Sequence, residues 1–470
     1  MRDYDLCYLE LSQVARLIHA RDVSIEEVTA AVMNRIQDLN SVLNCFVTVL
    51  KGKALEDASS LQAELRAGAY RGPLHGIPVS LKDNVLTRGI RTTGGSPILK
   101  EWIPDRDADV VAALRSAGAI IVGKTNLQQY AYGAPHPAFG DVHNPHRFEM
   151  TCGGSSTGSA AAMAAGMGYG SIGTDTGGSI RIPAAYCGVA GLKPTYGLVS
   201  RKGVIPVSSN LDHVGPIARS VRDCALMLDA VSTRRDRDGE HGYARDLGDG
   251  IIRLRIGVMK PQDRAPLDPT VASAFSRACD DLHALGADML EVELPDLFQA
   301  QLIMWTVSGV EAAELLRPQF REHRNEYNAT LRDRLDRAAF IPATEYVHAQ
   351  RVRELFRQQL NAVFKTVDVV VLPTVSVPAF KAGTDRLTIG GTEDDAPSIG
   401  SRLTALFNIT GHPALAIPCH TSSESLPISI QMVAASSNEA RLFQVAHTYE
   451  QLHRWNRIRP AAVEAKLLET

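Results

Sequence analysis

Three short segments place a lysine and two serines where they could attack a carbonyl compound. Lys82 ends the largely apolar run 77–81, and glycine pairs precede Ser155 and Ser179. A serine hydroxyl becomes a good nucleophile when a base takes its proton, and a lysine can be that base if burial lowers its pKa of about 10.4 to near neutrality. Because Lys82 follows an apolar segment, we expect it to be buried. The sequence predicts serine nucleophile chemistry with a lysine base.

The glycines before Ser179 could serve a second requirement of this chemistry. Attack on a carbonyl group places negative charge on its oxygen, which backbone N–H groups can stabilise. Gly177 and Gly178 carry no side chain that would obstruct the approach of these groups. The nucleophile and its oxyanion hole can therefore share one turn.

Two other motifs in the same Gly/Ser-rich region favour different chemistry. Residues 168–173 match a dinucleotide-binding fingerprint, but residues 176–211 contain none of the acidic side chains that the fingerprint requires about 20 positions later. Residues 154–158 match a nucleophile elbow centred on Ser156. Four late histidines could complete that site: His412, His420, His447 and His453. An α/β-hydrolase that uses Ser156 is thus the alternative on a different fold.

The lysine and serine segments together resemble the amidase signature family, whose members are Ser-Ser-Lys amide hydrolases. The resembling motifs extend over much of the chain: 72–84, 123–126, 153–200, 211–216 and 407–413. The resemblance implies that Ser179 forms the acyl-enzyme, that Lys82 is the base, and that Ser155 is the bridging serine, which has a cis peptide bond in the family. It also implies an oxyanion hole built from the backbone N–H groups of Thr176, Gly177, Gly178 and Ser179. Further support is expected from Ser156, Asp175 and Arg181. Either Ser156 or Thr157 is also expected to be a helix N-cap.

Alternating strands and helices must position these residues. Residues 1–60 predict N-terminal helices, and residues 65–230 form the expected catalytic core with a strand–helix–strand pattern. Residues 268–365 read mainly as helix and are expected to line the substrate pocket, with the arginine-rich stretch 332–337 solvated. Residues 366–470 return to the sheet. We expect one large α/β/α domain over residues 1–470, with a central mixed, twisted sheet surrounded by helices.

The composition is that of an ordinary globular protein. The 470 residues include 49 basic and 52 acidic side chains, a net charge of −3, and this balance favours neither a nucleic acid nor a membrane as partner. Seven scattered cysteines and a charged N-terminus predict a cytoplasmic location. We expect no metal or cofactor, and the oligomeric state stays open, with a homodimer as one option.

The predicted function is hydrolysis of a small-molecule carboxylic amide to an acid and ammonia or an amine. Candidate residues of the substrate pocket are Tyr130, Tyr132, Met304, Trp305 and Arg353. The last lies in a helix where the family's amidotransferase member has an arginine that helps to hold its amino-acid substrate. The alternatives within the family are the A subunit of a tRNA-dependent amidotransferase, which acts as a glutaminase, and a ureide- or biuret-type hydrolase. A non-catalytic binding protein on the same scaffold is a further alternative.

Overall fold

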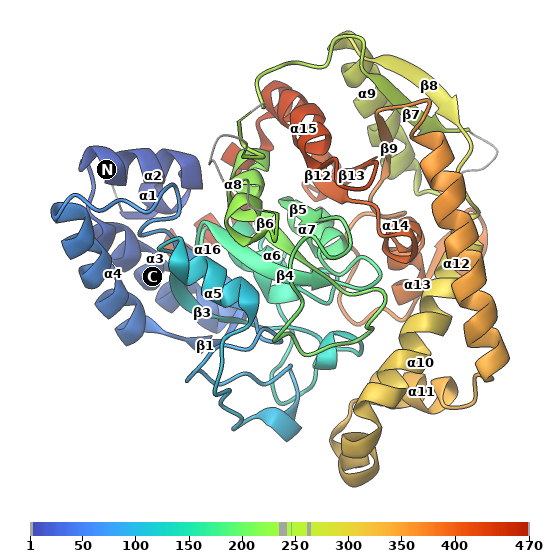
Figure 1. Ribbon diagram of the computed structural model, residues 1–470, viewed down its shortest axis with the longest axis horizontal. Helices are drawn as coiled ribbons and strands as arrows, with labels where there is room; N and C mark the ends of the chain where they lie inside the picture. Colours follow the sequence, from blue (N-terminus) through green and yellow to red (C-terminus); the bar gives the residue numbers. More distant parts are fainter. Residues whose placement is uncertain (1–2, 235–241, 246, 261–264, 469–470) are drawn as a thin grey trace.

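A mixed sheet runs through the centre of this large α/β domain (Figure 1). The computed structural model describes residues 3–234, 242–245, 247–260 and 265–468. Within these residues the sheet has eleven strands. In spatial order they are β1 (Phe46–Val49), β3 (Ile120–Thr125), β2 (Pro78–Lys82), β4 (Gly170–Asp175), β6 (His213–Ala218), β5 (Ala190–Lys193), β12 (Ala414–Thr421), β13 (Pro427–Ala434), β9 (Val369–Pro373), β7 (Arg255–Met259) and β8 (Asp288–Val292).

The strands that carry the predicted chemistry are buried on both faces. β2 lies between β3 and β4 and is parallel to both, with Leu81 opposite Ile172 of β4. Every residue of these three strands is buried. Helices cover both faces of such strands, which explains why the sequence around them is apolar rather than alternating. The mixed, helix-flanked sheet confirms the predicted fold class.

Helices surround the sheet in three groups (Figure 1). At one end lie α1 (Asp3–Cys7), α2 (Leu11–Ala20), α3 (Ile25–Leu43), α4 (Lys51–Arg66) and the C-terminal α16 (Ala461–Leu468). Around the middle lie α5 (Asp109–Ser116), α6 (Thr157–Ala164), α7 (Arg181–Cys187), α8 (Val221–Val231) and α15 (Glu439–His453), while α9 (Pro269–Ala284) lies at the edge of the molecule beside β7 and β8. The opposite side is formed by α10 (Leu297–His323), α11 (Ala329–Ala338), α12 (Ala343–Val363), α13 (Ala396–Ser401) and α14 (Ala405–Thr410).

The region 268–365 differs from its prediction in one element. It is helical except for β8, an edge strand that pairs in parallel with β7. Three of the five β8 residues are exposed, so the strand lacks the continuous apolar run by which buried strands are found. The next region, 366–470, returns to the sheet as expected but also contains the hairpin of β10 (Arg386–Ile389) and β11 (Thr392–Asp395).

No helix in the described part of the chain has both the length and the apolar character needed to cross a membrane. The apolar stretch 159–174 includes the end of α6, a short connection and most of β4, and all of its residues are buried inside the protein.

Candidate active site

Lys82 ends β2 in the interior of the molecule. Its Nζ lies 2.8 Å from Ser155 Oγ and 2.8 Å from Thr174 Oγ1, and the side chain has no exposed surface. Burial lowers the pKa of Lys82 to about 7, although the negative charges of Asp175 and Asp212 act in the opposite direction. A substantial fraction of this amine is therefore uncharged near neutral pH, and its lone pair can accept a proton from Ser155.

A backbone hydrogen bond holds the loop of Ser155 against the loop of Ser179. The Ser156 N–H donates to the Ser179 carbonyl oxygen at 3.1 Å. The Gly154–Ser155 peptide bond is cis, as the family resemblance implied. Lys82, Ser155 and Ser179, predicted from three distant segments, are thus brought to one place.

The turn before Ser179 is shaped by the carboxylate of Asp175. This carboxylate accepts hydrogen bonds from the N–H groups of Gly178 at 2.7 Å and Ile180 at 3.1 Å. Gly178 has a φ of +130°, a conformation that favours glycine. Its N–H is already engaged, so the prediction that Gly178 donates to the oxyanion is wrong.

Three other N–H groups of the turn have no hydrogen-bond acceptor among the described residues: Thr176, Gly177 and Ser179. All three of these residues line a cavity. They remain the candidate oxyanion donors.

Asp175 is paired with Arg181 in the protein interior. Arg181 Nε lies 3.1 Å from Asp175 Oδ2, and neither side chain is exposed. Burial by itself would raise the pKa of the Asp175 carboxyl group. The charge and hydrogen bonds of Arg181, together with a hydrogen bond from Asn408, outweigh burial and hold this pKa well below its usual range. Arg181 also donates to Gln431 Oε1 at 2.9 Å. This network supports the turn that carries Ser179.

Ser156 takes a structural position and not a nucleophilic one. It occupies the N-cap position of α6, yet its hydroxyl forms no capping hydrogen bond. Instead, Ser156 Oγ donates a hydrogen bond to the Thr174 carbonyl oxygen at 3.2 Å and accepts one from the Thr174 N–H at 3.3 Å. The elbow interpretation is therefore wrong. The dinucleotide fingerprint is wrong as well, because residues 170–173 lie within strand β4 instead of in a loop before a helix.

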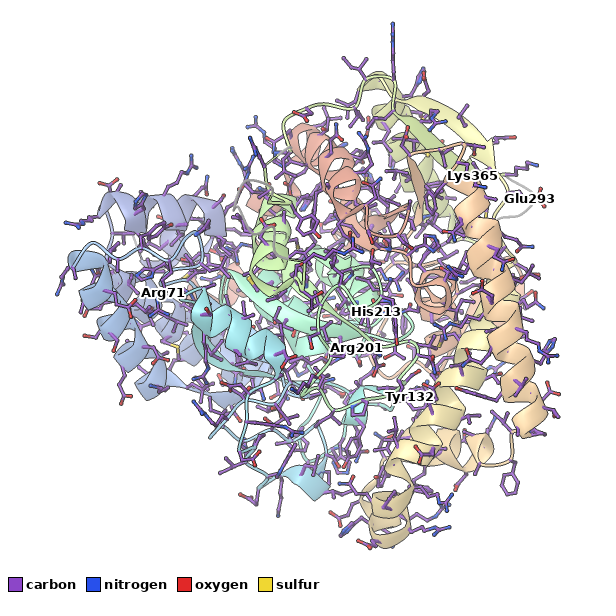
Figure 2. The ribbon with its side chains drawn as sticks, viewed as in Figure 1. Arg71, Tyr132, Arg201, His213, Glu293 and Lys365 are labelled. Carbon is purple, nitrogen blue, oxygen red and sulfur yellow. The ribbon has the colours of Figure 1, made fainter. Side chains whose placement is uncertain are left out.

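Ser179 opens into a cavity of about 440 Å³. Three of the predicted pocket residues line it: Tyr132, Met304 and Trp305. Met304 packs directly against the oxyanion turn, since a Cβ added at Gly177 would lie 2.9 Å from its sulfur. Figure 2 shows Tyr132 on the side of α10 that faces the centre of the molecule.

The other two predicted pocket residues do not line this cavity. The Tyr130 hydroxyl donates to Gln319 Oε1 at 2.8 Å, and its ring stacks on Tyr327. Arg353 donates to the backbone carbonyls of Ile409 at 2.6 Å and Asn210 at 3.1 Å. Its guanidinium is therefore engaged in joining backbone segments.

Arg334 lines the cavity and was missed by the sequence analysis. We expected its stretch of α11 to be solvated, and for Arg334 this is wrong. Its guanidinium carbon lies 4.6 Å from the centre of the Trp305 ring and 5.3 Å from that of Tyr132. Arginine on an amphipathic helix is common, so no sequence signal distinguished this residue from its neighbours.

Comparisons with known proteins agree with this geometry. The family model described as Amidase matches residues 27–443. The A subunit of the glutamyl-tRNA(Gln) amidotransferase of Thermosynechococcus vestitus is 35% identical, over 96% of this chain and 99% of that protein.

Two solved structures share the whole architecture. The first belongs to a vestigial protein complex that is described as revealing the evolutionary origins of an s-triazine catabolic enzyme. It superposes with a TM-score of 0.89 and is 29% identical, and the match covers 94% of this chain and 98% of that chain. The peptide amidase of Stenotrophomonas maltophilia gives a TM-score of 0.81 at 29% identity, covering 95% and 97%.

Proposed function

The chain belongs to the amidase family, and from this premise we propose that it cleaves the C–N bond of a small carboxylic amide through an acyl-enzyme on Ser179. The observation that carries the proposal is the buried Lys82 amine, 2.8 Å from Ser155 Oγ and with its pKa lowered to about 7. A lysine with this environment can act as a general base at neutral pH.

In the proposed first step, Ser179 Oγ bonds to the amide carbon while its proton passes to Ser155 and the Ser155 proton passes to neutral Lys82. The carbonyl oxygen becomes an oxyanion that faces the N–H groups of Thr176, Gly177 and Ser179. A single donor of this kind contributes about 2.7–4 kcal/mol to the stability of the transition state.

Collapse of the tetrahedral intermediate breaks the C–N bond. The leaving nitrogen takes back the proton through Ser155, so ammonia or an amine departs and an ester remains on Ser179. Water then attacks the acyl carbon of this ester, and its proton passes through Ser155 to Lys82. The bond between the acyl carbon and Ser179 Oγ breaks, and the proton returns through Ser155 to Ser179 Oγ. The products are the carboxylic acid and the free serine.

The dimensions of the cavity suit a small molecule. Its volume of about 440 Å³ lies within the range of small-molecule sites. Aromatic side chains line it and would pack against an organic acyl group: Tyr132, Tyr186, Trp305 and Phe380.

A second candidate is the A subunit of a tRNA-dependent amidotransferase, in which glutamine is hydrolysed and its ammonia passes to a partner. The similarity to the Thermosynechococcus vestitus protein favours this candidate over free amide hydrolysis. Arg353 counts against it, because its guanidinium binds backbone carbonyls and does not line the cavity. Both candidates share the acyl-enzyme step on Ser179.

Measurement of ammonia release tests the proposal and separates the candidates. The purified chain is incubated with acetamide, benzamide, indoleacetamide, a ureide and glutamine, with Ser179→Ala as the matched inactive control. We expect ammonia from at least one simple amide without tRNA or another protein. Release that requires both would establish the second candidate, and release unchanged in Ser179→Ala would contradict the catalytic assignment.

A further inference from the structure

Arg334 presents a cation to the cavity above Ser179. The guanidinium lies against the rings of Trp305 and Tyr132, which themselves line the cavity 6.1 Å apart. One of its N–H groups donates to the Tyr132 backbone carbonyl. Arginine has five N–H donors, so this single bond leaves most of its hydrogen-bonding capacity unused.

No carboxylate of the described residues forms an ion pair with Arg334. Asp395 and Asp333 influence it only by their charge, without a hydrogen bond. Its neighbour on α11, Arg337, is different, because an ion pair of 2.8 Å joins it to Asp333 on the exposed surface. A half-buried cation without a counter-ion is unfavourable, and a bound anion would relieve this cost.

The acidic residues around the cavity lie at its rim. Asp141 and Asp385 line it, but both are exposed to solvent, whereas Tyr132 and Met304 beside the reactive end are buried. Water screens the two rim charges more strongly than it screens a charge deeper in the cavity. Among the described residues that line the cavity, Arg334 is therefore the only charged side chain that is not exposed.

The position of Arg334 is fixed by the structure around it. The Asn328 side chain accepts a hydrogen bond from Leu331 N–H at 2.9 Å and so caps α11. The same side chain donates to Gln129 Oε1 at 3.0 Å and to the Ala134 carbonyl at 2.8 Å. These bonds fasten the start of α11 to the loop that carries Tyr132, so the guanidinium is preorganised before any ligand arrives.

The cation and the reaction centre share one wall of the cavity. Met304 contacts the oxyanion turn at Gly177, and the next residue of α10, Trp305, stacks on Arg334. A substrate whose amide lies at Ser179 can therefore extend along these two side chains and place its far end at the guanidinium.

We propose that Arg334 binds a carboxylate of the substrate, so that the preferred substrate is an amide whose acyl chain ends in a carboxylate remote from the scissile bond. The planar guanidinium matches a carboxylate in a two-point hydrogen bond, and the stacked rings hold its plane in place. The inference rests on the proposed function for the chemistry at Ser179, but the binding of the carboxylate does not depend on turnover.

Direct binding tests the inference separately from catalysis. Titration calorimetry with the Ser179→Ala protein compares succinamate, glutaramate and adipamate, each with its neutral methyl ester. We expect at least one acid to bind about ten- to a hundredfold more tightly than its ester, because hydrogen bonds to charged groups are the strong ones. Equal affinities for acid and ester in all three pairs would overturn the proposal.

Substitution assigns the effect to this one arginine. In Ser179→Ala with Arg334→Gln, the preference for the acid should vanish while the affinity for the ester stays within about threefold. Arg337→Gln on the same helix is the matched control and should keep the preference. If the preference persists in the Arg334→Gln protein, another group binds the carboxylate and the assignment is wrong. Turnover of the preferred acid by the unmodified protein then tests the proposed function, whose failure would leave the binding result unchanged.

Discussion

Replacing Lys82 with methionine should abolish acylation and at the same time stabilise the protein. Methionine has nearly the same length but no charge to lose on burial. The Lys82 pKa falls from 10.5 to about 7 on folding, and at 1.36 kcal/mol per pH unit this corresponds to about 5 kcal/mol of destabilisation at or below neutral pH. The substitution also removes the contacts with Ser155 and Thr174, at about 1 kcal/mol each. The free energy of unfolding of the methionine variant should therefore exceed that of the unmodified protein by about 3 kcal/mol at pH 6.

The gain must depend on pH in a particular direction. Below pH 7 the Lys82 amine is protonated in both the folded and the unfolded protein. Between pH 7 and 10.5 the unfolded chain binds one proton more, so the stability of the unmodified protein rises by about 1.4 kcal/mol per pH unit. The methionine variant lacks this slope. The extra stability of the methionine variant over the unmodified protein should therefore shrink above pH 7 and disappear near pH 9.

Urea unfolding of both proteins at pH 6, 7, 8 and 9 measures this difference. Ser179→Ala is the control, since it removes a hydroxyl without removing a titrating group, and its difference from the unmodified protein should not vary with pH. Two results would refute the conclusion that burial lowers the pKa of Lys82. One is a methionine variant that is less stable than the unmodified protein at pH 6, and the other is a stability difference that stays constant across the pH series.

Three further outcomes follow from the same site. The kcat/KM for an uncharged amide should rise with pH through about 7 and then level, because only neutral Lys82 accepts the proton; a flat profile from pH 5 to 9 would remove Lys82 as the base. Asp175→Asn should lower the free energy of unfolding by about 3–5 kcal/mol in urea titrations, because it leaves the buried Arg181 unpaired. Gly178→Ala should cost about 1–3 kcal/mol and slow acylation seen by rapid quench, because φ is +130° and the new Cβ would lie 2.4 Å from Thr404 Oγ1; unimpaired acylation would show that the turn can rearrange.

An exposed ion pair provides the control for the aspartate substitution. Asp333 pairs with Arg337 on the surface of α11, with both side chains more than half exposed. Asp333→Asn should change the stability by less than about 1 kcal/mol. A loss as large as that of Asp175→Asn would mean that burial is not the cause of the difference.

The apolar strands and the reactive segments could be predicted because their signals are local. A run such as 369–373 is recognisable by its composition, and glycines mark the turn before Ser179 by their conformational freedom. β8 could not be found in this way, because an edge strand with exposed residues leaves no continuous apolar pattern.

The use of individual polar groups in the site could not be predicted. The sequence suggests four oxyanion donors, yet Gly178 N–H is taken by Asp175. Similarly, nothing in the sequence shows that the Tyr130 hydroxyl pairs with Gln319 on α10, away from the cavity. Hydrogen-bond partners far apart in the chain meet only after the elements have packed.

By itself the sequence determined the α/β class, the family, and the lysine and serine segments, because backbone propensity, apolar runs and glycine positions act between near neighbours along the chain. Tertiary packing alone decided that Lys82 is sealed from water, that Arg334 turns inward against Trp305, and that Arg353 is engaged by backbone carbonyls. The physical reason is that burial and charge pairing depend on which distant segments surround a side chain, and this environment forms only when the chain has folded.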